Sequence, residues 1–213
     1  MNLQELTMKW QEQHVAIQQH MELNQKLAAE ISKMKVFHLF ASMRSIKILT
    51  LIVGLLWVMF IDGLLVATYS YASPYFFWSA FLQSLLTKVA IGVYLYQLVL
   101  VYQTDISETV VQTQQRIAKL TLSTLWVTRI LFLQLPLWTT FWWTEAFINE
   151  ISPIAQSLLF TFVILFTALA LWLFINIRMN NSEKPWFRWI FRGREWEPLV
   201  KANNLLTELN ANL

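Results

Sequence analysis

The chain has 213 residues, of which 56% are hydrophobic, and its formal net charge is +3. A soluble domain of this apolar content would expose large apolar patches, whereas an all-α integral membrane protein covers them with lipid. The absence of Cys excludes a disulfide framework, a thiolate zinc site and an iron–sulfur cluster.

Residues 1–42 are predicted to form one long amphipathic helix, because no Gly or Pro interrupts them. Alternating steps of three and four residues define a heptad seam, which polar Gln13, His20 and Asn24 interrupt. A helix that is polar outside one stripe needs a partner, which can be a second copy in a homodimer, the C-terminal helix or a different protein. The residues expected to bind it, helix in groove, are Leu3, Leu6, Trp10, Ile17, Leu27 and Ile31.

Four apolar runs follow, and each is long enough to cross a hydrocarbon core of about 30 Å at about 1.5 Å per residue. They cover approximately residues 46–70, 75–102, 120–143 and 154–177. We therefore expect a four-transmembrane-helix bundle over residues 43–178. The third run should extend as a helix into the loop before it, and Pro136 should kink its outer half.

Lys and Arg define the expected orientation of these runs. Six lie before or at the very start of the first run, two lie between the second and third, and six follow the fourth, while the two short connections on the opposite side have none. By the positive-inside rule both termini and the middle loop are cytoplasmic. The polar residues before the first run indicate an internal signal anchor rather than a cleaved signal peptide. The expected location is the bacterial inner membrane, with multiple spans.

Three ionisable residues, Asp62, Lys88 and Arg129, lie inside the first, second and third runs and are expected to form an intramembrane charge cluster. An unpaired charge near a helix centre costs about 2.5–3.5 kcal/mol on insertion scales, so Asp62 should pair with one of the two cations. The other cation then needs a polar side chain or a backbone carbonyl. We interpret the cluster as a structural ion pair, with an ion or proton path through Asp62 as the alternative.

Residues 179–213 are predicted to form an interfacial segment and a short terminal helix. The segment alternates aromatic and basic residues, which favours the lipid headgroup layer over stacking on single-stranded bases, so no direct nucleic-acid binding is expected. Its lipid-contacting residues are Trp186, Arg188, Trp189 and Arg192. After Pro198, Leu199 and Ala202 begin a seam that should pair with the N-terminal helix, within one chain or in a homodimer.

Catalytic motifs are missing from the sequence. The three His residues, His14, His20 and His38, lie before the first run, and none is four residues from another, as a helical metal pair requires. There is no Gly-rich phosphate loop, nucleophile elbow or HExxH motif. We therefore expect no enzyme activity, no metal site and no cofactor.

Several stretches resemble a group of small four-span Bacteroidota membrane proteins: MNLQELTMKWQEQ…MELNQKLAAEI, MRSIKILTLIVGLLW and GVYLYQLVLVYQTDISETVVQTQQRIAKL. The likeness covers about the first 145 residues. Proteins of this group look encoded beside sigma factors of the extracytoplasmic-function type. The resemblance implies an anti-sigma-like, membrane-tethered regulator that holds a sigma factor, and it implies no catalytic residues.

The expected function is therefore that of a non-enzymatic inner-membrane protein. Its cytoplasmic helices would bind a soluble protein partner, with a sigma factor as the candidate, and its spans would contact membrane lipid. One alternative is a homo-oligomeric transporter or channel subunit that uses Asp62, Lys88 and Arg129. Another is an accessory subunit of a larger membrane complex.

Overall fold

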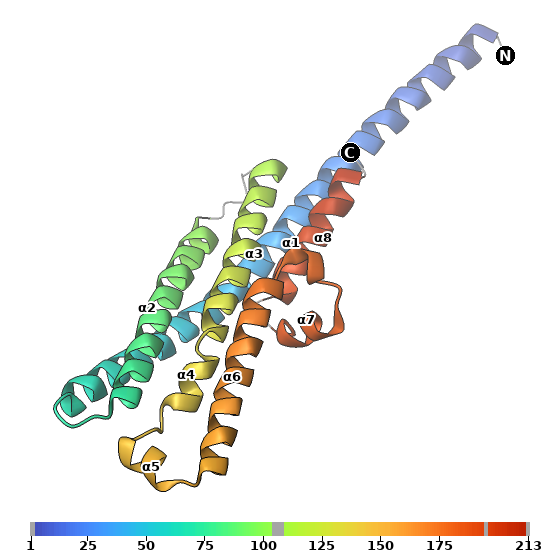
Figure 1. Cartoon of the computed structure of the whole chain (residues 1–213). Helices are drawn as coiled ribbons and strands as arrows, with labels where there is room; N and C mark the ends of the chain where they lie inside the picture. The colour runs from blue at the N-terminus through green and yellow to red at the C-terminus, as the bar shows by residue number, and fades with distance from the viewer. Residues whose placement is uncertain (1–2, 104–108, 194–195, 212–213) are drawn as a thin grey trace.

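The computed structural model describes residues 3–103, 109–193 and 196–211. Some side chains within these helices lie outside the description, namely those of residues 3–9, 11, 12, 25, 29, 33, 110, 203 and 206–211. The described residues form helices joined by turns and contain no strand, which confirms the all-α prediction (Figure 1).

Four helical segments are long and apolar enough to cross a membrane, as the sequence predicts. These candidate spans, called the first to the fourth span below, are the second half of α1 (Leu3–Thr68), α2 (Pro74–Tyr102), α3 (Val110–Phe132) together with α4 (Leu135–Thr140), and α6 (Pro153–Asn176). Shorter elements connect or follow them: α5 (Glu145–Glu150), a 3-10 turn (Met179–Asn181), α7 (Pro185–Ile190) and α8 (Glu197–Ala211).

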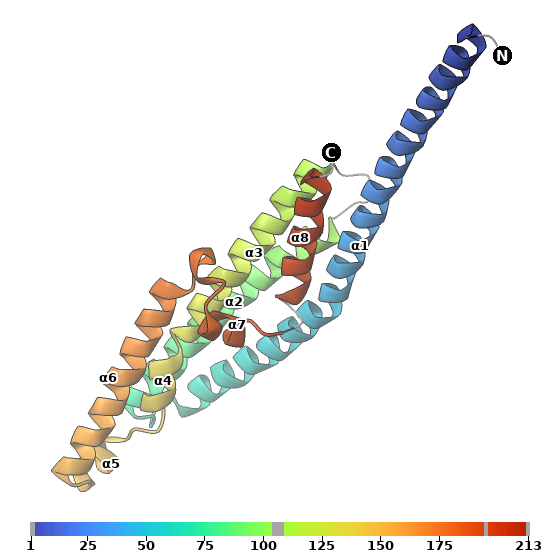
Figure 2. The same cartoon turned by 90° about the vertical axis from the view of Figure 1, so that its right-hand side faces the viewer.

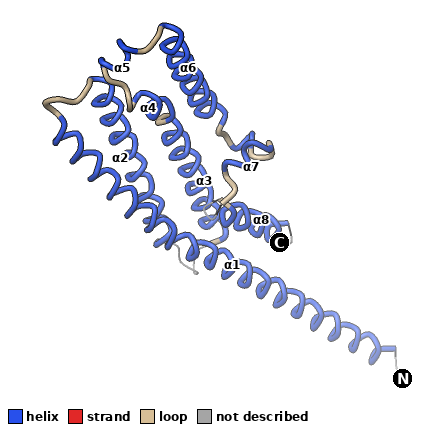
Figure 3. Tube along the Cα trace, turned by 90° about the horizontal axis from the view of Figure 1, so that it is seen from below, coloured by secondary structure: helices blue, strands red, loops and turns tan. Residues whose placement is uncertain are grey.

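The N-terminal helix and the first span are one uninterrupted helix. The expected boundary between residues 42 and 43 falls inside α1, whose 66 residues make it about 100 Å long at about 1.5 Å per residue. The first Gly of the chain is Gly54, and no Pro occurs before Pro74, so nothing in this stretch ends the helix. The N-terminal half of α1 projects beyond the other helices in all three views (Figures 1–3).

The third span is interrupted near its middle, as expected from Pro136. Helix α3 ends at Phe132, and α4 begins after a turn at Leu133 and Gln134. Pro136 has no N–H to donate to the carbonyl four residues back, so the helical ladder breaks just before it. At its other end α3 starts at Val110, ten residues before the expected start of the third span, where the Thr109 hydroxyl accepts from the Gln112 N–H.

The spans are arranged as a row rather than around a common centre. Helix α1 packs on α2 and α8, α2 packs on α3 and α4, and α6 packs on α3 and α4. Figures 2 and 3 accordingly show α1 and α6 at opposite edges, with α2, α3 and α4 between them. Along the helix axes, we call the end of these helices near α8 the α8 end and the end at which α5 lies the α5 end (Figures 1 and 2).

Two apolar clusters hold the α8 end together. In the first, Val36 and Phe40 of α1 are buried against Leu199 and Ala202 of α8 and against residues of α2 and α3. In the second, α7 is pinned against α3 and α6 by the residues Phe187, Phe191, Leu125, Leu173 and Ile177. Trp196 packs against both clusters. The terminal helix therefore pairs with α1, but further along α1 than most of the predicted N-terminal seam.

Candidate functional site

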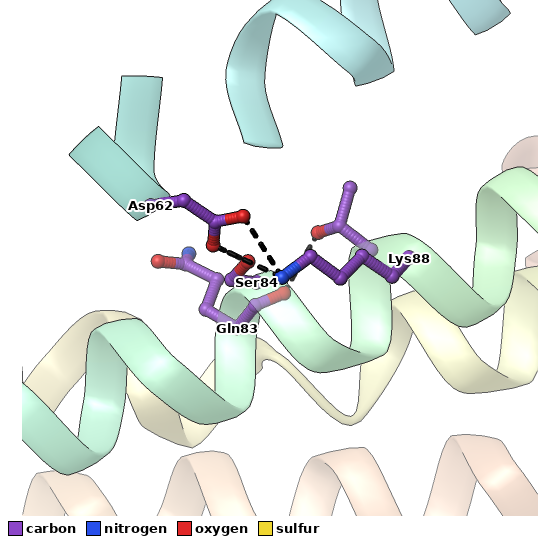
Figure 4. Close-up of polar contacts among 5 residues, drawn as sticks. Asp62, Gln83, Ser84 and Lys88 are labelled. Carbon is purple, nitrogen blue, oxygen red and sulfur yellow. Dashed lines mark hydrogen bonds and ion pairs between the residues drawn. The ribbon is translucent and has the colours of Figure 1, made fainter. Parts of the chain in front are cut away.

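Asp62 and Lys88 form an ion pair between α1 and α2. The Lys88 ammonium lies 2.9 Å from Asp62 Oδ2 and donates to Oδ1 at 3.1 Å, and the Ser84 hydroxyl donates to Oδ1 at 2.6 Å. Figure 4 shows the three side chains turned toward one another, Asp62 from α1 and the other two from neighbouring turns of α2. Because Ser84 and Lys88 are four residues apart, both reach the same carboxylate.

The ion pair is not enclosed by the chain. The Asp62 side chain is 40% exposed and that of Lys88 50%. On α2, Ser79, Gln83 and Thr87 are buried toward the interior, whereas Lys88 lies at the side. The two charged residues are therefore available to a second molecule.

Arg129 makes its contacts away from this pair. Its Nε donates to the carbonyl of Ile177 at 2.6 Å, and its guanidinium lies 5.3 Å from the ring centre of Trp126. Ile177 follows the last residue of α6, where helical carbonyls lack partners within the helix. The three ionisable residues therefore do not share one set of contacts. Asp62 pairs with Lys88, and Arg129 binds a backbone carbonyl, which is one of the two kinds of partner expected for the second cation.

A row of buried polar side chains on α2 is a feature that the sequence interpretation did not single out. The Ser79 hydroxyl lies 2.7 Å from that of Thr140, Gln134 Nε2 donates to Thr87 Oγ1 at 3.0 Å, and Gln97 Nε2 donates to Thr124 Oγ1 at 3.5 Å. These bonds join α2 to α3 and α4 from the α5 end to the α8 end. The four-residue spacing of Ser79, Gln83 and Thr87 within an apolar run is the signal that could have revealed it.

Lys47 is also part of the interior. The sequence interpretation counted it among the basic residues that flank the first span, yet its side chain is 0% exposed. Its ammonium donates to Gln97 Oε1 at 2.5 Å and lies 5.2 Å from the ring centre of Tyr94. Lys47, Gln97 and Thr124 thus link three helices through two side-chain hydrogen bonds.

Gln83 differs from the other buried polar residues. Its side chain is 1% exposed, and both of its amide atoms lack a hydrogen-bond partner among the described residues. Figure 4 places it on the turn of α2 that carries Ser84, beside the ion pair. A buried amide without partners costs about 1–3 kcal/mol, so Gln83 is a destabilising feature of the described structure.

The projecting half of α1 exposes the predicted partner-binding seam. Trp10 is 72% exposed, and Ile17, Leu27 and Ile31 are exposed as well. The side chains of Leu3 and Leu6 lie outside the described residues. Phe40, which packs against α8, lies on another face of α1, so α8 does not cover this seam.

The predicted lipid-contacting residues divide between two faces of the C-terminal segment. Arg188, Trp189 and Arg192 are exposed, with Trp189 at 79%, whereas Trp186 is half-buried and packs on Trp172 at 5.0 Å between ring centres. A groove of about 900 Å³ lies between α3 and this segment, with Arg188 and Arg192 among its lining residues. The side chains that anchor α7 to the other helices and its exposed basic side chains therefore lie on different faces of α7.

Within the described residues, no three or more His, Cys, Asp or Glu side chains come together as metal ligands would. No protein-family model, curated protein or solved structure matches this chain. The candidate functional features are therefore those of the chain itself: the exposed seam of α1, the open Asp62–Lys88 pair and the basic face of α7.

Proposed function

We propose that this protein is a non-enzymatic inner-membrane anchor that presents the projecting part of α1 to a soluble protein in the cytoplasm. The observation that carries the proposal is the continuity of α1, which passes without a break from an apolar span into a projecting segment with an exposed apolar seam. Such a seam is unfavourable in water unless another protein covers it.

The cytoplasmic placement rests on charge. Lys and Arg flank the spans at the α8 end, whereas the two connections at the α5 end carry neither. The projecting seam then faces the compartment in which transcription regulators work. The resemblance to proteins encoded beside extracytoplasmic-function sigma factors supplies the partner class, and an anti-sigma-like role follows from it as part of this proposal.

The binding mode that suits the seam is a helix in an apolar groove. Trp10, Ile17, Leu27 and Ile31 lie on one stripe, and large aromatic anchors such as Trp10 tend to dominate the binding energy of such interfaces. Polar Gln13, His20 and Asn24 lie on the same stripe, so the groove should offer hydrogen-bonding groups at matching intervals.

A photo-cross-linking residue in the full-length protein tests the proposal in living cells. Placed at Trp10 or Ile17, it should cross-link to the sigma factor encoded nearest to this gene. Val15 is an equally apolar and exposed residue off the seam, and a cross-linker there is the matched control. Absence of the sigma factor from both seam adducts, or equal capture from Val15, would contradict the proposed partner.

A transporter or channel subunit is the second candidate, and the buried polar row on α2 is the observation that favours it. Hydrogen-bonding side chains occur along the length of an otherwise apolar helix, as in many solute paths. This reading requires the purified protein to conduct ions or solutes in liposomes, with a flux that Asp62→Asn changes. An unchanged flux would contradict this second candidate function.

A further inference from the structure

The Asp62–Lys88 pair lies at a level where water is absent if the spans are inserted as proposed above. Lys88 is 14 residues from Pro74 and 14 from Tyr102, the two ends of α2. About 20 residues suffice to cross a bilayer core, so Lys88 lies near its middle. A carboxylate and an ammonium that are 40% and 50% exposed would there face lipid tails, which cannot hydrate them.

The surface around the pair is shaped to receive another chain. A groove of about 600 Å³ begins at Asp62 and runs toward the α5 end, lined by Asp62, Leu65, Val66, Tyr69, Phe77 and Phe81. Gly92 lies one turn from Lys88 on the other side, and a Cβ built there meets nothing within 4 Å. Another face of α2 is already occupied by α4 and the turn before it, to which Ser79 and Thr87 are hydrogen-bonded.

We propose that this surface, which we call the Asp62–Lys88 face, is a two-fold interface between two copies of the chain in the membrane. A two-fold axis along the membrane normal keeps both copies in the same orientation and brings equivalent residues to the same depth. Within the plane of the membrane, the same rotation reverses the direction that runs from the Asp62 carboxylate to the Lys88 ammonium. Each Asp62 then faces the Lys88 of the second copy, and four charges alternate in sign around the axis.

Charge complementarity selects a second copy as the occupant. A foreign helix would have to bring a matching cation and anion at one depth, whereas a second copy brings both by symmetry. The α6 edge of a second copy does not meet this requirement, because Pro153–Asn176 contains no charged residue. The interface is therefore expected to join like faces and to close as a dimer.

Single cysteines can report this interface, because the chain has none of its own. Val66 lines the groove and is 80% exposed, so two Val66→Cys copies should be joined by a bifunctional maleimide long enough to span the diagonal between the two α1 helices. Leu165→Cys is the matched control, since Leu165 is exposed on α6 at the opposite edge and should remain monomeric. A monomeric Val66→Cys protein, or stronger cross-linking of Leu165→Cys, would overturn the proposal.

Charge exchange tests the electrostatic part of the proposal. In the Val66→Cys background, Asp62→Lys puts four cations around the axis and should lower cross-linking by at least about tenfold. Combining Asp62→Lys with Lys88→Asp restores the alternation and should restore the dimer, and an inserted double variant that stays monomeric would contradict it. The inference rests on the membrane placement, so each variant is first checked for resistance to carbonate extraction. Release of the unmodified protein by carbonate would instead refute the proposed membrane function.

Discussion

The ammonium of Lys47 donates to Oε1 of Gln97 at 2.5 Å, and both side chains are completely buried between α1 and α2. Gln97→Leu would remove this acceptor and leave Lys47 less well solvated. Hydrogen bonds to charged groups contribute about 1.5–3 kcal/mol, and we expect a loss of stability in that range. Unfolding by added SDS, starting from detergent micelles, measures it, and an unchanged midpoint would show that the bond is not stabilising.

Gln83→Leu, at a similarly buried position of α2, is expected to have the opposite effect on stability. Neither amide atom of Gln83 has a partner among the described residues. Replacing the amide with an apolar side chain of similar size therefore removes a buried polar group that lacks hydrogen bonds. The variant should be as stable as the unmodified protein or slightly more so in the same SDS titration. A loss above about 1 kcal/mol would indicate that Gln83 makes a hydrogen bond that the structure does not contain.

Phe187 and Trp189 lie on the buried and the exposed face of α7, respectively. Phe187 is fully buried, 4.3 Å from Phe191 and 5.5 Å from Trp196 between ring centres, so Phe187→Ala should cost about 3–5 kcal/mol. Trp189→Ala removes an exposed ring and should change the unfolding free energy by less than about 0.5 kcal/mol. Equal losses in the two variants would contradict this division of the helix.

Ala202 lies in the cluster through which α8 packs on α1. Ala202→Leu adds three carbon atoms to a site that is 0% exposed, and overpacking of this kind costs about 1–3 kcal/mol. We expect α8 to detach and to be removed by protease at lower concentrations than in the unmodified protein, as followed by mass spectrometry. Val200→Leu, at an exposed position of the same helix, should leave the protease sensitivity unchanged.

The sequence predicts the four apolar helices because each is a long and predominantly apolar run, which is the strongest signal that a sequence carries. It also predicts the interruption near Pro136, where the missing N–H acts locally. The arrangement of the spans in a row could not be predicted from the sequence in this way. Apolar residues surround α6 on all sides, so periodicity does not indicate which face packs against α3 and α4.

The candidate site shows the same division between local and tertiary information. Opposite charges on successive spans allow Asp62 to pair with Lys88, but Arg129 was an equal candidate until the position of the Ile177 carbonyl was known. Lys47 was counted as a flanking residue because the start of a span cannot be located to within one turn from hydropathy. Its burial depends on Gln97 and Tyr94, about 50 residues away.

A nitroxide at position 189 tests whether the exposed face of α7 lies in the headgroup layer. Trp189→Cys introduces a unique cysteine for spin labelling, and the aromatic and basic composition of this face predicts a label between the hydrocarbon and water. In liposomes the label should collide with both oxygen and a water-soluble nickel complex, at rates between those of hydrocarbon and bulk water. Val15→Cys, on the projecting part of α1, is the control and should report bulk water alone. A label at 189 as accessible to nickel as the one at 15 would place this face away from lipid.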